Sequence, residues 1–412
     1  MAYRFNSNID TSTPVVVFRS ENYTSLGIVR TLGRMGVKVF CIDHEPNALA
    51  MKSRYCAGRF NWNVESSSPD DTIQFLTNVA CKIGQMPILI PTFDTRNIFV
   101  DKYREQLSKW FLLPQPKPCA LKQLYSKQGM YELCKSENLP TAKTIFPYSM
   151  EQVLNEGHKL GFPVVVKAID GDRLKRRTGK RLAIVQEMPE LKNVYIELDE
   201  PGLRNLLLQE FIPCDVEDAW VVSAYFDIKG NCQFALTGKK LRQLPIHGGL
   251  TTLGVCAPCE PVVMSICQII KAVGYHGIID ADFIFDKRDG LWKLLDVNPR
   301  PGANFRLLVD KHGLDVVRAL YLDLTGQSVP PIEPHWGRRW VVEDMDLAAF
   351  LNHSREGSLS IRTWLGSLRG VSEFAHISIG DLQPSISFLT KLISYYTNKF
   401  INRLLQPSKL NS

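Results

Sequence analysis

Residues 294–302 read Leu-Leu-Asp-Val-Asn-Pro-Arg-Pro-Gly, and they follow an alternating apolar segment, 278–285, that contains Asp282. Both segments have the composition of strands, and Asp296 and Asn298 occupy positions i and i+2 of the second one. Because side chains at i and i+2 lie on one face of a strand, we expect these two oxygen donors to point the same way. Carboxylate and amide oxygens are the ligands that Mg²⁺ takes together with phosphate oxygens. Asp282, Asp296 and Asn298 are therefore the candidate metal ligands.

Arg300 continues the same i, i+2 series beyond Asn298. Its guanidinium would lie within reach of a phosphoryl group held beside the metal ligands, since arginine matches the geometry of phosphate oxygens. The flanking Pro299 and Pro301 stiffen the backbone where the strand ends. Arg300 is therefore a candidate catalytic residue.

Two lysines, Lys127 and Lys167, lie upstream on separate predicted elements. Lys167 ends the apolar run 163–167, and a lysine there cannot stay buried without an anion. The anion is either an internal carboxylate or a bound group such as a phosphate.

The segment Gln209-Glu210-Phe211-Ile212 has the form of a strand edge that offers backbone groups beside apolar side chains. An adenine ring requires this combination, and Glu217 could accept hydrogen bonds from ribose hydroxyls. By itself the pattern also fits a strand with a solvated face. It indicates a nucleotide site only in combination with the other motifs along the chain.

Two basic segments are further candidates. Residues 170–181 read Asp-Gly-Asp-Arg-Leu-Lys-Arg-Arg-Thr-Gly-Lys-Arg, which predicts a hairpin with a positive tip that could act as a lid. The basic strand that holds Lys240 and Arg242 runs into the glycine-containing loop 247–252, where backbone N–H groups can approach anionic oxygens. Lys240 and Arg242 are candidate catalytic residues, whereas His247 either takes part or is a loop residue without a role.

The N-terminal part predicts a parallel sheet. Residues 15–18 and 37–42 are β-branched runs, and an apolar helical pattern at 26–35 separates them. The turn after the first run lacks the glycine pattern that a dinucleotide pyrophosphate requires. This argues against an NAD-dependent or FAD-dependent dehydrogenase.

Composition narrows the class further. The chain has 412 residues, of which 45% are hydrophobic and 22% charged, as expected of a globular protein with two to four domains. The net charge of +7 is too dilute to indicate a nucleic-acid partner. We find no signal peptide and no apolar run long enough to span a membrane, and the ten cysteines are typical of reduced thiols. These features predict a cytoplasmic protein.

The motifs, in their order along the chain, resemble those of the ATP-grasp superfamily. The resemblance rests on Lys127, residues 162–167, residues 209–212 with Glu217, Asp282 and residues 296–300. It extends over roughly residues 120–325, and it is strongest to carboxylate–amine ligases of the carbamoyl-phosphate-synthase-like and D-aspartate-ligase-like groups.

The resemblance implies ATP as cofactor, with two lysines on its phosphates, the Glu-Phe-Ile strand on adenine and the following acid on ribose. It also implies two Mg²⁺ ions, or Mn²⁺ in their place, on the acidic residues and the asparagine. Two features depart from the family. The basic segment 170–181 replaces a glycine-rich and serine-rich hairpin, and aspartates 282 and 296 replace the glutamates of many relatives.

We therefore expect an α/β fold that continues as α+β, with the architecture of an ATP-grasp protein. The expected parts are a Rossmann-like domain (1–115), a small lobe (116–200), a large lobe with the metal site (201–330) and a C-terminal extension (331–412). In the extension, residues 386–405 predict a basic amphipathic helix. That helix either contacts the cytoplasmic face of a membrane or packs on the protein's own core.

The expected function is an ADP-forming ligase that joins a small carboxylate to an amine, or to a thiol, through an acyl phosphate. Two alternatives remain at this point. One is a carboxylase that activates bicarbonate as carboxyphosphate, and the other is a non-catalytic ATP-binding scaffold at a membrane assembly.

Overall fold

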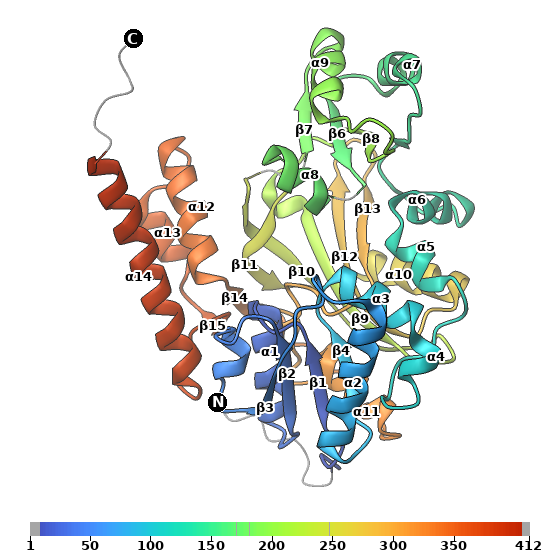
Figure 1. The fold of residues 1–412 in the computed structure, drawn as a ribbon. Coiled ribbons are helices and arrows are strands. Elements are labelled where there is room, and N and C mark those ends of the chain that lie inside the picture. Colours follow the sequence, from blue (N-terminus) through green and yellow to red (C-terminus); the bar gives the residue numbers. More distant parts are fainter. Residues whose placement is uncertain (1–8, 170, 181, 247, 406–412) are drawn as a thin grey trace.

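The computed structural model describes residues 9–169, 171–180, 182–246 and 248–405. Three β-sheets organise these residues, and helices pack against each of them (Figure 1). The fold is a mixture of parallel α/β structure at the N-terminus and largely antiparallel sheets after it, as predicted.

The N-terminal sheet is parallel and has the strand order β3-β2-β1-β4. Its strands and helices are β1 (Val15–Phe18), α1 (Tyr23–Gly33), β2 (Val39–Asp43), η1 (Leu49–Lys52), β3 (Cys56–Asn61), α2 (Pro69–Ile83), β4 (Ile88–Pro91), α3 (Asp94–Lys102) and α4 (Arg104–Leu107). In β1, Val15 and Val17 face one apolar core while Val16 and Phe18 face another. Burial on both faces explains the uninterrupted apolar run, and the predicted strand–helix–strand unit is confirmed.

The second sheet has four strands in the order β5-β8-β6-β7 and forms the small lobe. Its strands and helices are β5 (Thr144–Ile145), α7 (Met150–Leu160), β6 (Val164–Ala168), α8 (Gly171–Thr178), β7 (Leu182–Val185), α9 (Met188–Leu198) and β8 (Leu206–Glu210). Strand β8 therefore lies in the small lobe, where Val165 pairs with Gln209.

Strands β6 and β7 pair antiparallel, as the predicted hairpin requires, but the basic segment between them contains a helix, α8, in place of a simple turn. Its apolar residue, Leu174, is buried, which gives the segment an inner side. Arg173 bonds to Glu200, and Lys180 bonds to Glu197, so α9 and the loop after it anchor the basic side chains. Residues 170 and 181, at the ends of the predicted turn, lie outside the described residues.

The largest sheet has seven strands in the order β13-β12-β9-β10-β11-β14-β15. The elements from the middle of the chain are α5 (Ala120–Tyr125), α6 (Lys127–Ser136), η2 (Val216–Asp218), β9 (Ala219–Phe226), β10 (Cys232–Leu244), β11 (Leu250–Cys256), α10 (Glu260–Val273), β12 (Gly277–Asp286), β13 (Leu291–Asn298) and α11 (Val316–Leu324). Helices α5, α6 and α10 pack on one face of the sheet. The other face packs partly against the N-terminal domain, where Val221 and Leu236 share a core with Val15.

Residues 331–412, which the sequence analysis sets apart as an extension, contribute two strands to this sheet. The elements are β14 (Arg339–Val341), α12 (Glu343–Arg355), α13 (Ile361–Ser367), β15 (Val371–Phe374) and α14 (Leu382–Leu405). Strand β14 pairs with β11, and β15 pairs with β14. The region therefore covers a sheet edge that would otherwise be unpaired.

Helix α14 lies along the outside of the molecule (Figure 1). On one face Phe388 is buried and Leu392 packs against the core, so this part of the helix docks on the protein itself. In the described residues, no helix is long and apolar enough to cross a membrane.

Candidate active site

The candidate metal ligands face one another across two neighbouring strands. In the β12–β13 pair, Asp282 lies opposite Asp296, and Asp280 lies opposite Asn298. The pairing shifts by one residue at Leu295, so Leu294 and Val297 both face the core beneath the sheet. The bulge leaves the oxygen donors together on the opposite face.

The two predicted phosphate-binding lysines reach the same place from other elements. Lys127 begins α6, where the Ser126 side chain caps the helix, and its Nζ lies 3.0 Å from Oδ1 of Asp296. Lys167 lies near the end of β6 in the small lobe. Burial, together with the positive charge of Lys127, lowers the pKa of Lys167 to about 8, against the opposing effect of Asp296 and Asp282.

Lys240 completes the cluster on the second acid. Its Nζ lies 2.8 Å from Oδ1 of Asp282 and donates a hydrogen bond to the carbonyl oxygen of Gly249 at 3.2 Å. The lysine therefore joins β10 to the loop before β11, and the loop residue His247 lies outside the described residues.

Arg300 lies between the metal ligands and the N-terminal domain. Its guanidinium bonds to Oδ1 of Asn298 at 3.2 Å and forms an ion pair with Asp94, the first residue of α3. The N-terminal domain thus contributes a carboxylate to the edge of the cluster.

Sequence reasoning missed Asp94 and Asp280. Asp280 is buried, and its burial together with the charge of Asp282 raises its pKa to about 8. Its spacing of i, i−2 from Asp282 was a readable signal, whereas nothing local to Asp94 indicates that it meets Arg300.

Arg242 does not join the cluster. Its Nε and Nη2 bond to the two carboxylate oxygens of Asp346 in α12, at 2.7 and 3.0 Å, and both side chains are buried. The pairing of β10 with β11 shifts between Lys240 and Arg242, so the two side chains do not follow the i, i+2 rule.

The predicted adenine segment lies where the small lobe meets the large sheet. Ile212 is buried against Ala142, Ile284 and Leu295, so this apolar cluster adjoins the acids through Leu295. Phe211 follows β8 and its backbone N–H donates to the carbonyl oxygen of Pro163.

The polar residues of that segment are fixed by protein partners. Gln209 donates to the Thr144 hydroxyl at 2.9 Å. The buried Glu210 accepts from the Lys143 backbone N–H at 2.9 Å and from Arg288 at 3.1 Å. Glu217, the predicted ribose ligand, is exposed in η2.

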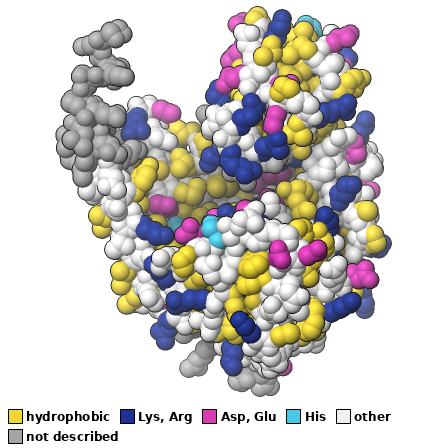
Figure 2. Space-filling view, viewed as in Figure 1, with side chains coloured by type: hydrophobic (Ala, Val, Ile, Leu, Met, Phe, Trp, Pro, Cys, Tyr) yellow, Lys and Arg dark blue, Asp and Glu magenta, His cyan; other side chains and the backbone are white. Residues whose placement is uncertain are grey.

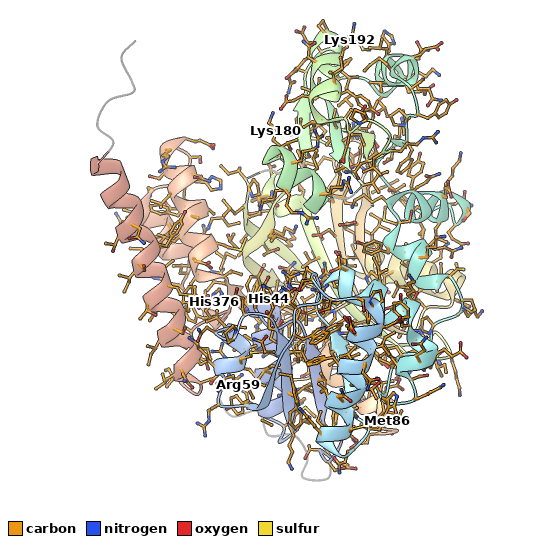
Figure 3. The ribbon with its side chains drawn as sticks, in the orientation of Figure 1. His44, Arg59, Met86, Lys180, Lys192 and His376 are labelled. Carbon is orange, nitrogen blue, oxygen red and sulfur yellow. The ribbon has the colours of Figure 1, made fainter. Side chains whose placement is uncertain are left out.

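The small lobe and the N-terminal domain, which contribute Lys167 and Asp94, border a hollow in the surface. Figure 2 shows the surface hollowed between the small lobe, the N-terminal domain and the C-terminal helices, with lysine and arginine side chains on the small lobe above it. Lys180, two residues after the end of α8, is labelled on the small lobe in Figure 3. A phosphate chain entering the hollow would meet cations on several sides.

The donor set fits a hard divalent cation. Asp282, Asp296 and Asn298 offer three oxygen ligands on one face of the sheet. The ammonium groups of Lys127 and Lys240 lie on the two carboxylates, so cations already occupy the positions at which a metal ion would be attracted.

We expect ATP binding to weaken as the pH rises above about 8. Lys167, with a pKa of about 8, is protonated below that pH and binds phosphate, and it loses its charge above it. The dissociation constant for ATP, measured by calorimetry, should rise by up to about tenfold per pH unit above 8. In Lys167→Arg, whose guanidinium does not titrate, this rise should disappear; an unchanged rise would assign it to another group.

Known proteins show the same fold. No family model matches the chain. Among solved structures, biotin carboxylase from Campylobacter jejuni superposes with a TM-score of 0.62 at 16% identity, covering 80% of this chain and 75% of that one. L-amino acid ligase from Bacillus licheniformis gives 0.58 at 15% identity, with 79% and 76% covered. The chain therefore has the ATP-grasp fold.

Two curated proteins resemble the sequence itself. D-aspartate ligase of Enterococcus faecium (strain Aus0004) is 25% identical over 287 residues, which are 65% of this chain and 67% of that protein. N5-carboxyaminoimidazole ribonucleotide synthase of Synechococcus elongatus (strain ATCC 33912 / PCC 7942 / FACHB-805) is 25% identical over 187 residues, so the match spans 45% of each protein. The chain thus has the fold of ATP-grasp enzymes and is similar in sequence to ATP-dependent ligases and carboxylases.

Proposed function

We propose that the chain is a carboxylate–amine ligase that uses ATP to form an acyl phosphate and releases ADP. The observation that carries the proposal is the convergence of two acids, Asp282 and Asp296, with three cations, Lys127, Lys240 and Arg300. Such a site positions a phosphate chain and offsets its charge, which is most of what phosphoryl transfer requires of a protein.

Each group has a role in this scheme. Lys127 and Lys167 hold the α- and β-phosphates, and the apolar cluster around Ile212 holds adenine. Mg²⁺, or Mn²⁺ in its place, would be held by Asp282, Asp296 and Asn298, and it would neutralise charge on the phosphates. Arg300 and Lys240 bind the oxygens of the transferred phosphoryl group and of the carboxylate that attacks it.

The positions of Glu210 and Arg242 refine the proposal. Because the Glu210 side chain is held by Lys143 and Arg288, its contribution to adenine binding is limited to its backbone. Arg242 pairs with Asp346 and has a structural role in the proposal. Of the two candidate residues on the basic strand, Lys240 is the one assigned to the reacting groups.

The acceptor is either an amine or a thiol. We propose an amine, because the two ligases among the relatives are named for amino acids, which carry one.

The names of the relatives narrow the substrates. D-aspartate ligase and L-amino acid ligase are named for amino acids. We propose that an amino acid or a similar small acid supplies the carboxylate or the amine in the reaction of this chain. The alternative, a carboxylase that forms carboxyphosphate, is supported by the similarity to the synthase and to biotin carboxylase. A non-catalytic scaffold would have no need of the paired acids and lysines. We place the reaction in the cytoplasm, where ATP is available.

Phosphate release from Mg²⁺-ATP tests the proposal against a panel of amino acids, other small acids and amines, with bicarbonate as a separate arm. Release that requires both an acid and an amine supports a ligase. Release that requires bicarbonate would assign the chain to the carboxylase alternative, and ATP binding without release in any arm would favour the scaffold.

A further inference from the structure

Helix α14 presents an apolar face that no other described residue covers. Leu382, Ile386, Leu389 and Ile393, here called the outer stripe, are 58, 59, 40 and 65% exposed. Their spacing of four, three and four residues places them along one side of the helix. Ile379, in the turn before the helix, is 91% exposed and continues the patch. A contiguous apolar surface of this kind marks an interaction site.

A second face of the same helix fixes its orientation. The Phe388 ring stacks on His376 with centroids 4.0 Å apart, and Figure 3 labels His376 where the C-terminal region meets the N-terminal domain. Just before the helix, the buried Asp381 pairs with Arg30 at 2.9 Å and also accepts from the Ser53 hydroxyl. Turning the outer stripe inward would break this buried ion pair, so the stripe stays exposed.

Two cations lie near the start of the helix. Arg34 and Arg54 are exposed on the neighbouring surface. The exposed Lys391 is two residues from both Leu389 and Ile393, so it lies on the side of the helix away from the stripe. Arg34 bonds to the Ser378 hydroxyl at 3.2 Å, and the Arg54 backbone N–H bonds to Asp381 at 2.9 Å, which places both beside the start of the helix. Residues 377–412 contain four lysines and arginines, and their one acid is the buried Asp381.

We propose that this face of α14 binds an anionic membrane surface. The apolar stripe would enter the boundary between headgroups and acyl chains, and Arg34 and Arg54, beside the start of the helix, would contact the lipid phosphates. A second copy of the chain fits the face less well, because its stripe would bring the same positive charges into contact. The proposal places the ligase on the cytoplasmic face of a membrane but does not depend on the reaction that it catalyses.

Co-sedimentation of the full chain with vesicles tests this inference. We expect binding to vesicles of phosphatidylcholine with phosphatidylglycerol, little binding to phosphatidylcholine alone, and release as salt rises. The triple variant Ile386→Ser, Leu389→Ser, Ile393→Ser should bind the anionic vesicles at least about tenfold more weakly. The double variant Arg34→Glu, Arg54→Glu should weaken binding by about fivefold or more.

A matched triple variant controls for the loss of exposed apolar residues as such. Ile196→Ser, Ile228→Ser, Met264→Ser removes side chains that are 57, 66 and 64% exposed elsewhere, and it should bind like the natural chain. Circular dichroism checks the folding of both triple variants. Failure of the natural chain to bind anionic vesicles, or equal binding by the stripe variant, would overturn the proposal. A natural chain that is a dimer and does not bind vesicles, together with a stripe variant that is a monomer, would assign the face to a second copy of the chain. That result would also overturn the proposal.

Discussion

Replacing Asp296 with asparagine should lower the rate of ATP turnover about a thousandfold while leaving the protein folded. The carboxylate of Asp296 forms an ion pair with Lys127, and its charge favours the protonated form of Lys167. Asp296 lies opposite Asp282 across the strand pair. The substitution replaces an anionic proposed metal ligand with a neutral amide and removes one negative charge from beside Lys127 and Lys167. Steady-state ADP formation with the acid–amine pair found by the panel measures the effect.

The matched control is Asp289→Asn, in the turn of the same hairpin. Asp289 lies 3.0 Å from Lys293 and outside the cluster, so turnover should stay within about twofold of the natural rate. Thermal unfolding of both variants separates a lost site from a lost fold. A folded Asp296→Asn protein with full turnover would contradict the metal assignment.

Replacing Arg242 with methionine should lower the free energy of unfolding by about 3–5 kcal/mol. The substitution leaves the buried carboxylate of Asp346 without its bidentate partner, although Thr252 and Trp364 still donate to it. Urea denaturation measures the loss. Lys287→Met breaks ion pairs of an exposed lysine with Asp215 and Asp218 and should lower the free energy of unfolding far less.

Turnover separates Arg242 from its neighbour Lys240. At a temperature where both variants are folded, Lys240→Met should turn over about a hundredfold more slowly, because its ammonium lies on Asp282 beside the reacting phosphate. Arg242→Met should keep most of its activity there. The reverse order would place Arg242 at the chemistry and Lys240 in a supporting role.

The sequence predicted the acids of the site because their convergence is local. Asp296 and Asn298 share a face through the two-residue repeat of a strand, and Asp282 lies on the strand that pairs with it. The approach of Lys127 and Lys167 from separate elements followed only from the family resemblance, since no local pattern connects residues that are so far apart along the chain.

Other features could not be predicted because they depend on tertiary packing. The bulge that sends Arg242 toward α12 changes side-chain direction without changing composition. Strands β14 and β15 are too short to show a repeat, and they form because β11 offers an unpaired edge. The strands of the predicted hairpin pair, but the connection 171–178 between them is a helix whose one apolar residue, Leu174, is buried.

The most direct test of an acyl phosphate follows the oxygen of the substrate carboxylate. With the carboxylate labelled with ¹⁸O, attack on the γ-phosphate places a labelled oxygen between carbon and phosphorus. Attack by the amine then leaves that oxygen on the released phosphate. Mass spectrometry should find one ¹⁸O in each phosphate and none in ADP. Labelled AMP, or phosphate without label during amide formation, would contradict the mechanism.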